Sequence, residues 1–250
     1  MSASFFAKRE WAERGWKGSN MTLLRVGGLT PLTATDYPGH LAAVVFCQGC
    51  PWRCAYCHNP HLIPPRASAQ IEWPAVMQFL ARRVGLLDAV VFSGGEPTLQ
   101  SALAQAVNEV KAMGFKCGLH TAGAYPEHLA SLLPLLDWVG FDIKASFTDY
   151  AQITQTPGSG HSAEASLQAL LASGVPYECR TTVDLQFFDT QKLIDLAQSL
   201  AASGVRHYVL QTCRDPHTPG RQCLTQVNAW LAELANTIAL SFDTFVLRPA

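Results

Sequence analysis

Four cysteines gather in one short segment of this chain. Cys47, Cys50, Cys54 and Cys57 fall within eleven positions, whereas the other four of the eight cysteines are scattered along the 250 residues. Eight cysteines are too few for a disulfide scaffold of this length, and such a cluster in a reducing compartment is typical of a metal site. The segment therefore predicts that thiolates coordinate a metal ion or an iron–sulfur cluster.

The spacing of these cysteines allows two kinds of site. Either two Cys-x2-Cys pairs supply four thiolates, or Cys50, Cys54 and Cys57 form a Cys-x3-Cys-x2-Cys set with Cys47 left over. Four thiolates would complete a structural zinc or electron-transfer site, whereas three thiolates on a cubane cluster leave one iron open to a substrate. The pairs of a zinc ribbon usually lie about 15 to 20 residues apart, so the close spacing favours iron and sulfur. We interpret Cys47 as a small buried residue at a strand end.

A second group of residues with chemical potential follows the apolar run at residues 88–92. Gly94 and Gly95 lack side chains, which lets the backbone approach a bound ligand closely. The carboxylate of Glu96 could accept hydrogen bonds from an ammonium group. The same pattern also makes ordinary turns, so its meaning depends on where the fold places it.

Three charged residues lie in apolar surroundings further along the chain. Asp142 and Lys144 are two positions apart at the end of the run 137–142, so their side chains would project to the same side of a strand. They would form either a simple ion pair or part of a polar site. Arg180 must be paired or face a polar cavity, because burying its charge alone is prohibitive.

The elements that would position these residues follow a repeating pattern. Short, continuously apolar runs alternate with segments of helical period, which is typical of parallel strands buried on both faces. Six such units predict an α/β fold, a partial or full (β/α)6 TIM-like barrel with its site at the carboxyl ends of the strands. A helix is expected over residues 190–203 with Thr190 as its N-cap. The expected strands are residues 41–46, 88–92, 115–120, 137–142, 176–183 and 207–211.

Composition excludes several classes of function. Hydrophobic residues make up 48% of the chain and charged residues 15%, which argues against intrinsic disorder, and a net charge of −1 predicts neither a nucleic-acid nor a membrane surface. No apolar run in the sequence approaches the roughly 18 residues that span a bilayer. We expect a cytoplasmic protein with a single domain over residues 21–250, preceded by an extension over residues 1–20 whose order the sequence leaves open.

The cysteine segment resembles a known signature. Three cysteines with this spacing and an aromatic residue, Tyr56, before the last of them resemble the radical S-adenosylmethionine (radical SAM) enzymes. Residues 49–59 are similar to the form found in activating enzymes of glycyl-radical proteins. Residues 35–39 and 59–62 narrow the resemblance to anaerobic ribonucleoside-triphosphate reductase activating proteins, and it runs from about residue 26 to residue 211.

The resemblance implies a cofactor and a reaction. Cys50, Cys54 and Cys57 would be the catalytic metal ligands that hold a [4Fe-4S] cluster, and the fourth iron would be chelated by the amino and carboxylate groups of SAM. One electron from the reduced cluster would split the sulfonium into methionine and a 5′-deoxyadenosyl radical. His58 and His61 are interpreted as loop residues.

The resemblance also places residues around SAM. Glu96 of the Gly-Gly-Glu motif would hold the methionine amino group, and Lys144 would lie near the methionine carboxylate. His120 stands where relatives often have aspartate, so only Thr121 is carried over there, toward the ribose, and a cation site is not supported. The expected cofactor-binding residues are Tyr56 near the adenine, Gly94, Gly95, Glu96, Thr121, Asp142, Lys144, Arg180 and His207.

The implied function is that of an activating enzyme. The partner would be a large glycyl-radical enzyme, the anaerobic ribonucleoside-triphosphate reductase, and electrons would come from a low-potential donor such as flavodoxin or ferredoxin. One alternative is activation of another glycyl-radical enzyme, or a small-molecule reaction such as ring contraction in deazapurine biosynthesis. The alternative from another class is a zinc or four-cysteine binding module.

Overall fold

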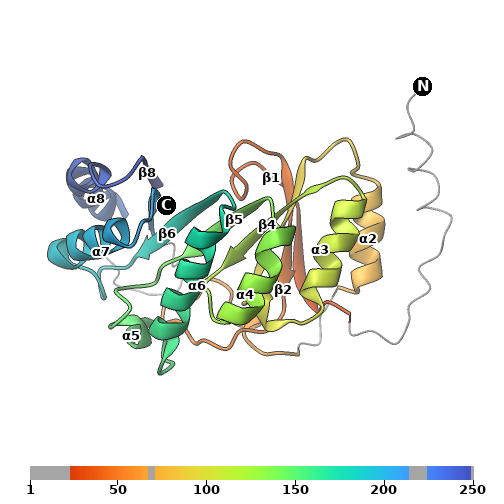
Figure 1. The fold of residues 1–250 in the computed structure, drawn as a ribbon, viewed down its shortest axis with the longest axis horizontal. Helices are drawn as coiled ribbons and strands as arrows, with labels where there is room; N and C mark the ends of the chain where they lie inside the picture. Colours follow the sequence, from red (N-terminus) through yellow and green to blue (C-terminus); the bar gives the residue numbers. More distant parts are fainter. Residues whose placement is uncertain (1–22, 67–70, 214–223, 249–250) are drawn as a thin grey trace.

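The computed structural model describes residues 23–66, 71–213 and 224–248, and within them one curved sheet organises the chain (Figure 1). The strands follow one another in the order of the sequence, β1 to β8. β1 is antiparallel to β2, and every later neighbouring pair is parallel. The strands are β1 (Val26–Thr33), β2 (Ala42–Cys47), β3 (Ala89–Gly94), β4 (Lys116–Thr121), β5 (Trp138–Asp142), β6 (Tyr177–Val183), β7 (His207–Thr212) and β8 (Thr244–Arg248).

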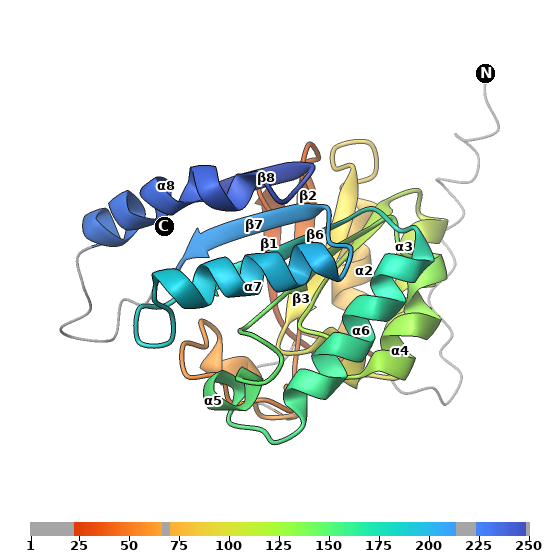
Figure 2. The same ribbon diagram turned by 60° about the vertical axis from the view of Figure 1, so that its left-hand side comes forward.

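Helices connect the parallel strands and cover one face of the sheet (Figure 2). They are α2 (Trp73–Ala81), α3 (Leu103–Ala112), α4 (Pro126–Leu132), α5 (Tyr150–Thr154), α6 (Ser159–Ser173), α7 (Thr190–Ala202) and α8 (Leu224–Ala239), with short 3-10 turns at η1 (Pro60–Leu62), η2 (Pro97–Leu99) and η3 (Leu133–Leu135).

The two faces of the sheet have different cores. The larger core joins helical residues such as Leu80 and Val107 to strand residues such as Val45 and Phe92. The smaller core is made of strand and loop residues without a helical member: Tyr37, Ala42, Val44, Ala89, Val91 and Trp138. Both faces of the central strands are therefore buried, which explains their continuous apolar character.

The six predicted strands are present, and the structure adds two more. β1 contains Gly27, Gly28 and Pro31, which weaken a strand signal, but Pro31 is tolerated because β1 lies at an edge of the sheet. β8 is a five-residue strand at the opposite edge. β1 and β8 do not pair in the described part of the chain, so the barrel is partial and not closed.

The one helix with predicted bounds agrees with the structure to within one residue, except at its N-cap. The predicted helix over 190–203 is α7, but its N-cap is Asp189 and not Thr190, because the Asp189 carboxylate accepts a hydrogen bond from the Lys192 amide at 2.8 Å. The Thr190 hydroxyl instead accepts a hydrogen bond from Trp230 Nε1 at 3.0 Å. The glycine that follows α7, Gly204, has a φ of +96°, which ends the helix where the sequence predicted.

The expected extension over residues 1–20 lies outside the described residues. Among the residues that are described, no helix combines the length and hydropathy needed to cross a bilayer.

Candidate functional site

A cavity of about 280 Å³ lies where the carboxyl ends of the parallel strands meet. Residues of the loops after β2, β3, β4 and β5 line it together with residues of strands β6 and β7, as expected for a parallel α/β fold. The sequence-predicted residues that line it are Cys50, Cys54, Tyr56, Cys57, Gly94, Gly95, Glu96, Thr121, Asp142, Lys144 and Arg180. All of the predicted site residues except His207 are thus brought together.

The cysteine loop follows β2 and is tied to its surroundings by backbone hydrogen bonds. The Cys50 amide donates to the Ile63 carbonyl at 3.0 Å, and the Ala55 amide donates to the Ile153 carbonyl of α5 at 3.0 Å. Cys47 is the last residue of β2, is fully buried, and is not among the residues that line the cavity. Three of the four clustered thiols therefore face the cavity.

The chemistry of the three thiols fits an iron–sulfur cluster. Burial raises the pKa of Cys50 to about 12 and also raises the pKa of Cys54, so neither thiol ionises at neutral pH without a compensating cation. Iron ions supply that compensation, because ligation and loss of the thiol proton occur together. In the described residues no three His, Cys, Asp or Glu side chains converge on a single metal ion. In a cluster each thiolate binds a different iron, so the three thiols need not converge on one point.

Glu96 is the most completely hydrogen-bonded carboxylate of the site. Its Oε1 accepts hydrogen bonds from the Thr98 amide (3.1 Å), the Thr98 hydroxyl (2.7 Å) and the Thr121 hydroxyl (2.7 Å), and its Oε2 accepts one from the Ala122 amide (3.0 Å). Burial raises the pKa of Glu96, and these donors oppose that effect. The residue is fixed at the cavity wall with its Oε2 less fully occupied than its Oε1. The Thr121 hydroxyl thus helps to fix Glu96, and its approach to a ribose stays a prediction.

Gly95 lets the loops after β2 and β3 lie in contact. Its amide donates to the Cys47 carbonyl at 3.0 Å, and a Cβ at this position would overlap the Gly49 carbonyl. Gly95→Ala should therefore separate the loops and lower the free energy of unfolding by about 1–3 kcal/mol in urea denaturation. Gly28→Ala is the control, because its Cβ would meet Phe46 at an ordinary 3.6 Å. Equal stability of the two variants would contradict the packing role.

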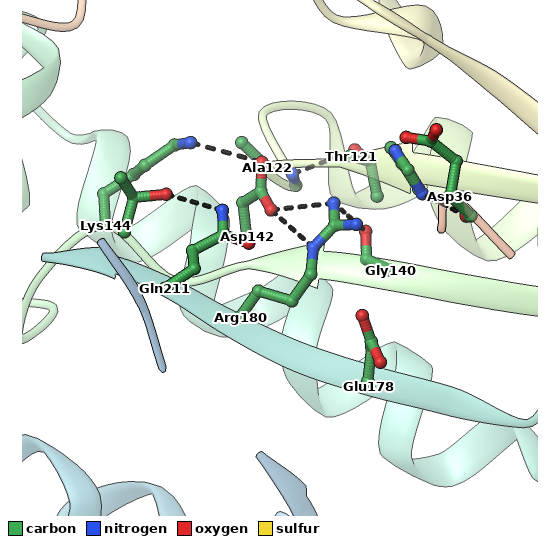
Figure 3. A network of polar contacts seen from close by, with 12 residues as sticks. Asp36, Thr121, Ala122, Gly140, Asp142, Lys144, Glu178, Arg180 and Gln211 are labelled. Atoms are coloured by element: carbon green, nitrogen blue, oxygen red, sulfur yellow. Dashed lines mark hydrogen bonds and ion pairs between the residues drawn. The ribbon is translucent and has the colours of Figure 1, made fainter. Parts of the chain in front are cut away.

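Three charges form a network at the ends of β5 and β6 (Figure 3). Arg180 donates from Nε to Asp142 Oδ1 at 3.0 Å, and its Nη2 lies 2.8 Å from the same oxygen. Lys144 Nζ lies 3.3 Å from Asp142 Oδ2. Burial by itself would raise the pKa of Asp142, but the two cations outweigh burial and lower it. The network stays ionised and carries one net positive charge.

Tyr56 brings unused hydrogen-bonding capacity to the cavity. The side chain is 5% exposed, and within the described residues its buried hydroxyl has no hydrogen-bond partner. Its ring centroid lies 6.0 Å from Lys144 Nζ. Because an unpaired buried hydroxyl is costly, the position suits contact with a polar group of a ligand.

His120 is held neutral inside the sheet. Its Nε2 lies 2.8 Å from the Asp36 carbonyl oxygen, and burial together with the nearby Arg180 charge lowers the pKa of His120 to about 3. His120 is thus a hydrogen-bonded histidine near the end of β4. Because residue 120 is a histidine and not an aspartate, the site has no carboxylate at this position.

The buried state of His120 predicts a pH dependence of stability. A histidine in the unfolded chain takes up a proton below about pH 6.5, whereas folded His120 does not, so the free energy of unfolding falls as the pH is lowered. The His120 contribution should amount to about 2 kcal/mol between pH 8 and pH 5. Urea denaturation of His120→Gln should show a shallower pH dependence than the parent protein. The same slope in both proteins would show that His120 titrates normally.

His207 is the predicted residue that the structure leaves away from the cavity. It begins β7, its Nδ1 lies 2.8 Å from Thr244 Oγ1, and its ring contacts Tyr177. Gln211, at the other end of the same strand, lines the cavity and donates to the Thr182 hydroxyl at 2.7 Å. Gln211 could have been predicted from its position near the carboxyl end of the expected strand 207–211. Other lining residues that sequence reasoning missed are Asp36, Trp52, Ser93 and Thr182.

Comparison with known sequences decides the family. The sequence model of the Radical SAM superfamily matches residues 44–200, more than half of the chain. This chain belongs to the radical SAM superfamily. It is therefore an enzyme of a family that uses SAM and an iron–sulfur cluster, in agreement with the thiol and carboxylate groups around the cavity.

Relatives of this radical SAM enzyme have several reactions. A Methanocaldococcus jannaschii protein named as a candidate glycyl-radical enzyme activating enzyme is 31% identical over 184 residues, covering 70% of this chain and 75% of that protein. The pyruvate formate-lyase-activating enzyme of Clostridium pasteurianum is 32% identical over 129 residues, 50% of this chain and 54% of that enzyme. The 7-carboxy-7-deazaguanine synthase of Thermococcus kodakarensis is 31% identical over 118 residues, 38% of this chain and 46% of that enzyme.

Solved structures share the fold. Streptococcus suis SuiB bound to its precursor peptide SuiA superposes with a TM-score of 0.66 at 10% sequence identity, covering 82% of this chain and 48% of SuiB. At this identity the likeness concerns the fold alone. The radical SAM chain described here thus spans about half the length of SuiB and of the Clostridium enzyme.

Proposed function

We propose that this radical SAM enzyme activates a glycyl-radical enzyme, and that its target is the anaerobic ribonucleoside-triphosphate reductase. The observation that carries the proposal is that Cys50, Cys54 and Cys57 line one cavity together with Glu96 and Lys144. Three thiols there suit a [4Fe-4S] cluster with one iron left open. Names of two similar proteins, from Methanocaldococcus and Clostridium, refer to activating enzymes and support the class of target.

The side chains have distinct tasks in this proposal. The cluster, when bound, supplies one electron to the sulfonium of SAM. Oε2 of Glu96 would accept hydrogen bonds from the methionine ammonium, and the Lys144 ammonium would attract the methionine carboxylate. Arg180 would keep Asp142 ionised and in place, and Tyr56 would contact the adenine. The apolar and hydrogen-bonded walls would exclude water from the reacting atoms.

The proposal predicts a protein radical on the target. Anaerobic enzyme with a complete cluster, SAM, a reductant and the reductase should give methionine, 5′-deoxyadenosine and a glycyl-radical signal in electron paramagnetic resonance. A target variant with alanine in place of the radical glycine is the control and should give no such signal. Cleavage of SAM without a radical on the reductase would remove the reductase as the target and leave the cleavage chemistry in place.

A small-molecule reaction is the second candidate. The similarity to a 7-carboxy-7-deazaguanine synthase over 118 residues favours it. In that case SAM would still be cleaved to methionine and 5′-deoxyadenosine, but the label of a deuterated small substrate, and not that of a deuterated glycine, would appear in 5′-deoxyadenosine. Mass spectrometry of this product separates the two candidates.

A further inference from the structure

The cysteine loop is a basic surface on a chain that is otherwise slightly acidic. The segment from residue 47 to residue 71 contains Arg53 and Arg66 and no aspartate or glutamate, whereas the whole chain has 18 basic and 19 acidic residues. Both arginines are exposed, as are His58 and His61 in the same loop. Positive charge is therefore concentrated beside the thiols that would hold the cluster.

Arg53 is fixed against a cluster ligand. Its Nη1 donates to the carbonyl oxygens of Cys50 and Trp52, each at 3.1 Å. Its own amide donates to the Thr154 carbonyl of α5 at 2.9 Å, and the residues of α5 carry no charge. No carboxylate of the described chain forms an ion pair with Arg53. Its charge therefore remains available to a partner.

Arg66 follows the part of the loop that returns to the cysteine segment. The Cys50 amide donates to the Ile63 carbonyl at 3.0 Å, and Pro65, the residue before Arg66, packs beside Gly49. Neither Arg53 nor Arg66 is among the residues that line the cavity. Both arginines are thus exposed residues of the cysteine loop outside the cavity lining, and Arg53 is hydrogen-bonded to the backbone of Cys50.

We infer that this basic surface, defined by Arg53 and Arg66, is the docking site of a small acidic one-electron carrier protein. The inference rests on the proposed function, because a cluster that cleaves SAM must receive an electron before each cleavage. The rate of electron transfer falls steeply with distance, so a donor that docks next to Cys50 reduces the cluster faster. Unpaired positive charge steers an acidic partner to that position and orients it there.

The electron balance of this step is simple. When the carrier is flavodoxin, its flavin hydroquinone loses one electron and becomes the semiquinone. The oxidised cluster gains that electron. No bond of the protein forms or breaks. Arg53 and Arg66 act on the encounter between the two proteins and do not touch SAM.

Charge reversal tests the docking site in the cluster-loaded enzyme. Arg53→Glu and Arg66→Glu should each slow reduction of the cluster by flavodoxin hydroquinone at least tenfold at low salt, and should weaken binding of oxidised flavodoxin by a similar factor in calorimetry. Arg82→Glu is the matched control. Arg82 is exposed at the end of α2, and its replacement by glutamate changes the net charge by the same amount. It should alter both quantities less than twofold. Rising salt should slow the parent enzyme toward the rates of the two loop variants.

Two further measurements separate docking from catalysis. With dithionite as reductant, Arg66→Glu should cleave SAM as fast as the parent enzyme, and Arg53→Lys, which keeps the charge, should retain most of the flavodoxin rate. If flavodoxin reduces Arg53→Glu and Arg66→Glu, both with full iron content, as fast as it reduces Arg82→Glu, the docking site is overturned. The proposed function would be left intact by that result. Failure of the parent enzyme to cleave SAM even with dithionite would overturn the proposed function itself.

Discussion

Cys54→Ala is expected to abolish cluster assembly and to lower SAM cleavage by at least about a thousandfold. Cys54 lines the cavity together with Cys50 and Cys57, and a cluster held by two thiolates has lost one of its three protein ligands. The measurement is iron and sulfide per chain after anaerobic reconstitution, together with the rate of 5′-deoxyadenosine formation with dithionite. Cys50→Ala and Cys57→Ala should behave in the same way.

Cys47→Ala is the informative control for this result. Cys47 is a fully buried residue at the end of β2 and does not line the cavity, so alanine should be accepted there with a loss of about 1 kcal/mol of stability and with full iron content. If Cys47→Ala loses its iron as completely as Cys54→Ala, the site uses four cysteines, no iron is left open for SAM, and the proposed reaction cannot occur.

The sequence was most informative where one short segment carries the whole signal. Cys50, Cys54 and Cys57 lie in one loop, so their spacing alone specifies which thiols can act together. The three-residue motif that ends in Glu96 is equally local, and position after an apolar run was enough to place it at the cavity. Local patterns of this kind need no knowledge of how distant elements pair.

Contacts between strands were harder to foresee. Burial required that Arg180 have a partner, but that the partner is Asp142 follows from the pairing of β5 with β6, in which these two residues are directly opposite. The hydrogen bond from Thr121 to Glu96 joins residues 25 positions apart and likewise depends on packing. His207 shows the reverse error: residue type drew attention to it, whereas its position at the start of β7 turned it away from the cavity.

Edge strands were missed for a physical reason. β1 carries two glycines and a proline, which a central strand would not tolerate, and its register with β2 contains irregularities. β8 has the alternating exposure of a strand with one free side, in a run of only five residues. Neither has the continuous apolar character that marks the inner strands, so the open edges of the partial barrel needed the structure to be seen.

Glu96→Gln is expected to raise the KM for SAM about 10- to 100-fold while leaving the iron content unchanged. An amide oxygen could still accept from Thr98 and Thr121, but the amide nitrogen would face the Ala122 amide, donor against donor. The variant also loses the negative charge that an ammonium group would require, and hydrogen bonds to charged groups contribute about 1.5–3 kcal/mol, which corresponds to roughly 10- to 100-fold in affinity.

The Glu96 result can be told apart from simple misfolding. Glu164→Gln, on the exposed side of α6, removes the same charge away from the cavity and should leave the KM unchanged. Thr121→Val removes one donor to Glu96 and leaves its charge, so its KM should rise by a smaller factor than that of Glu96→Gln. Burial already raises the pKa of Glu96, so the parent enzyme should also bind SAM more weakly as the pH falls, whereas Glu96→Gln, which has no carboxyl proton to gain, should lose that dependence. A parent-like KM in Glu96→Gln at every pH would mean that the methionine ammonium is held elsewhere, and the assignment of the Gly-Gly-Glu segment to SAM binding would fail.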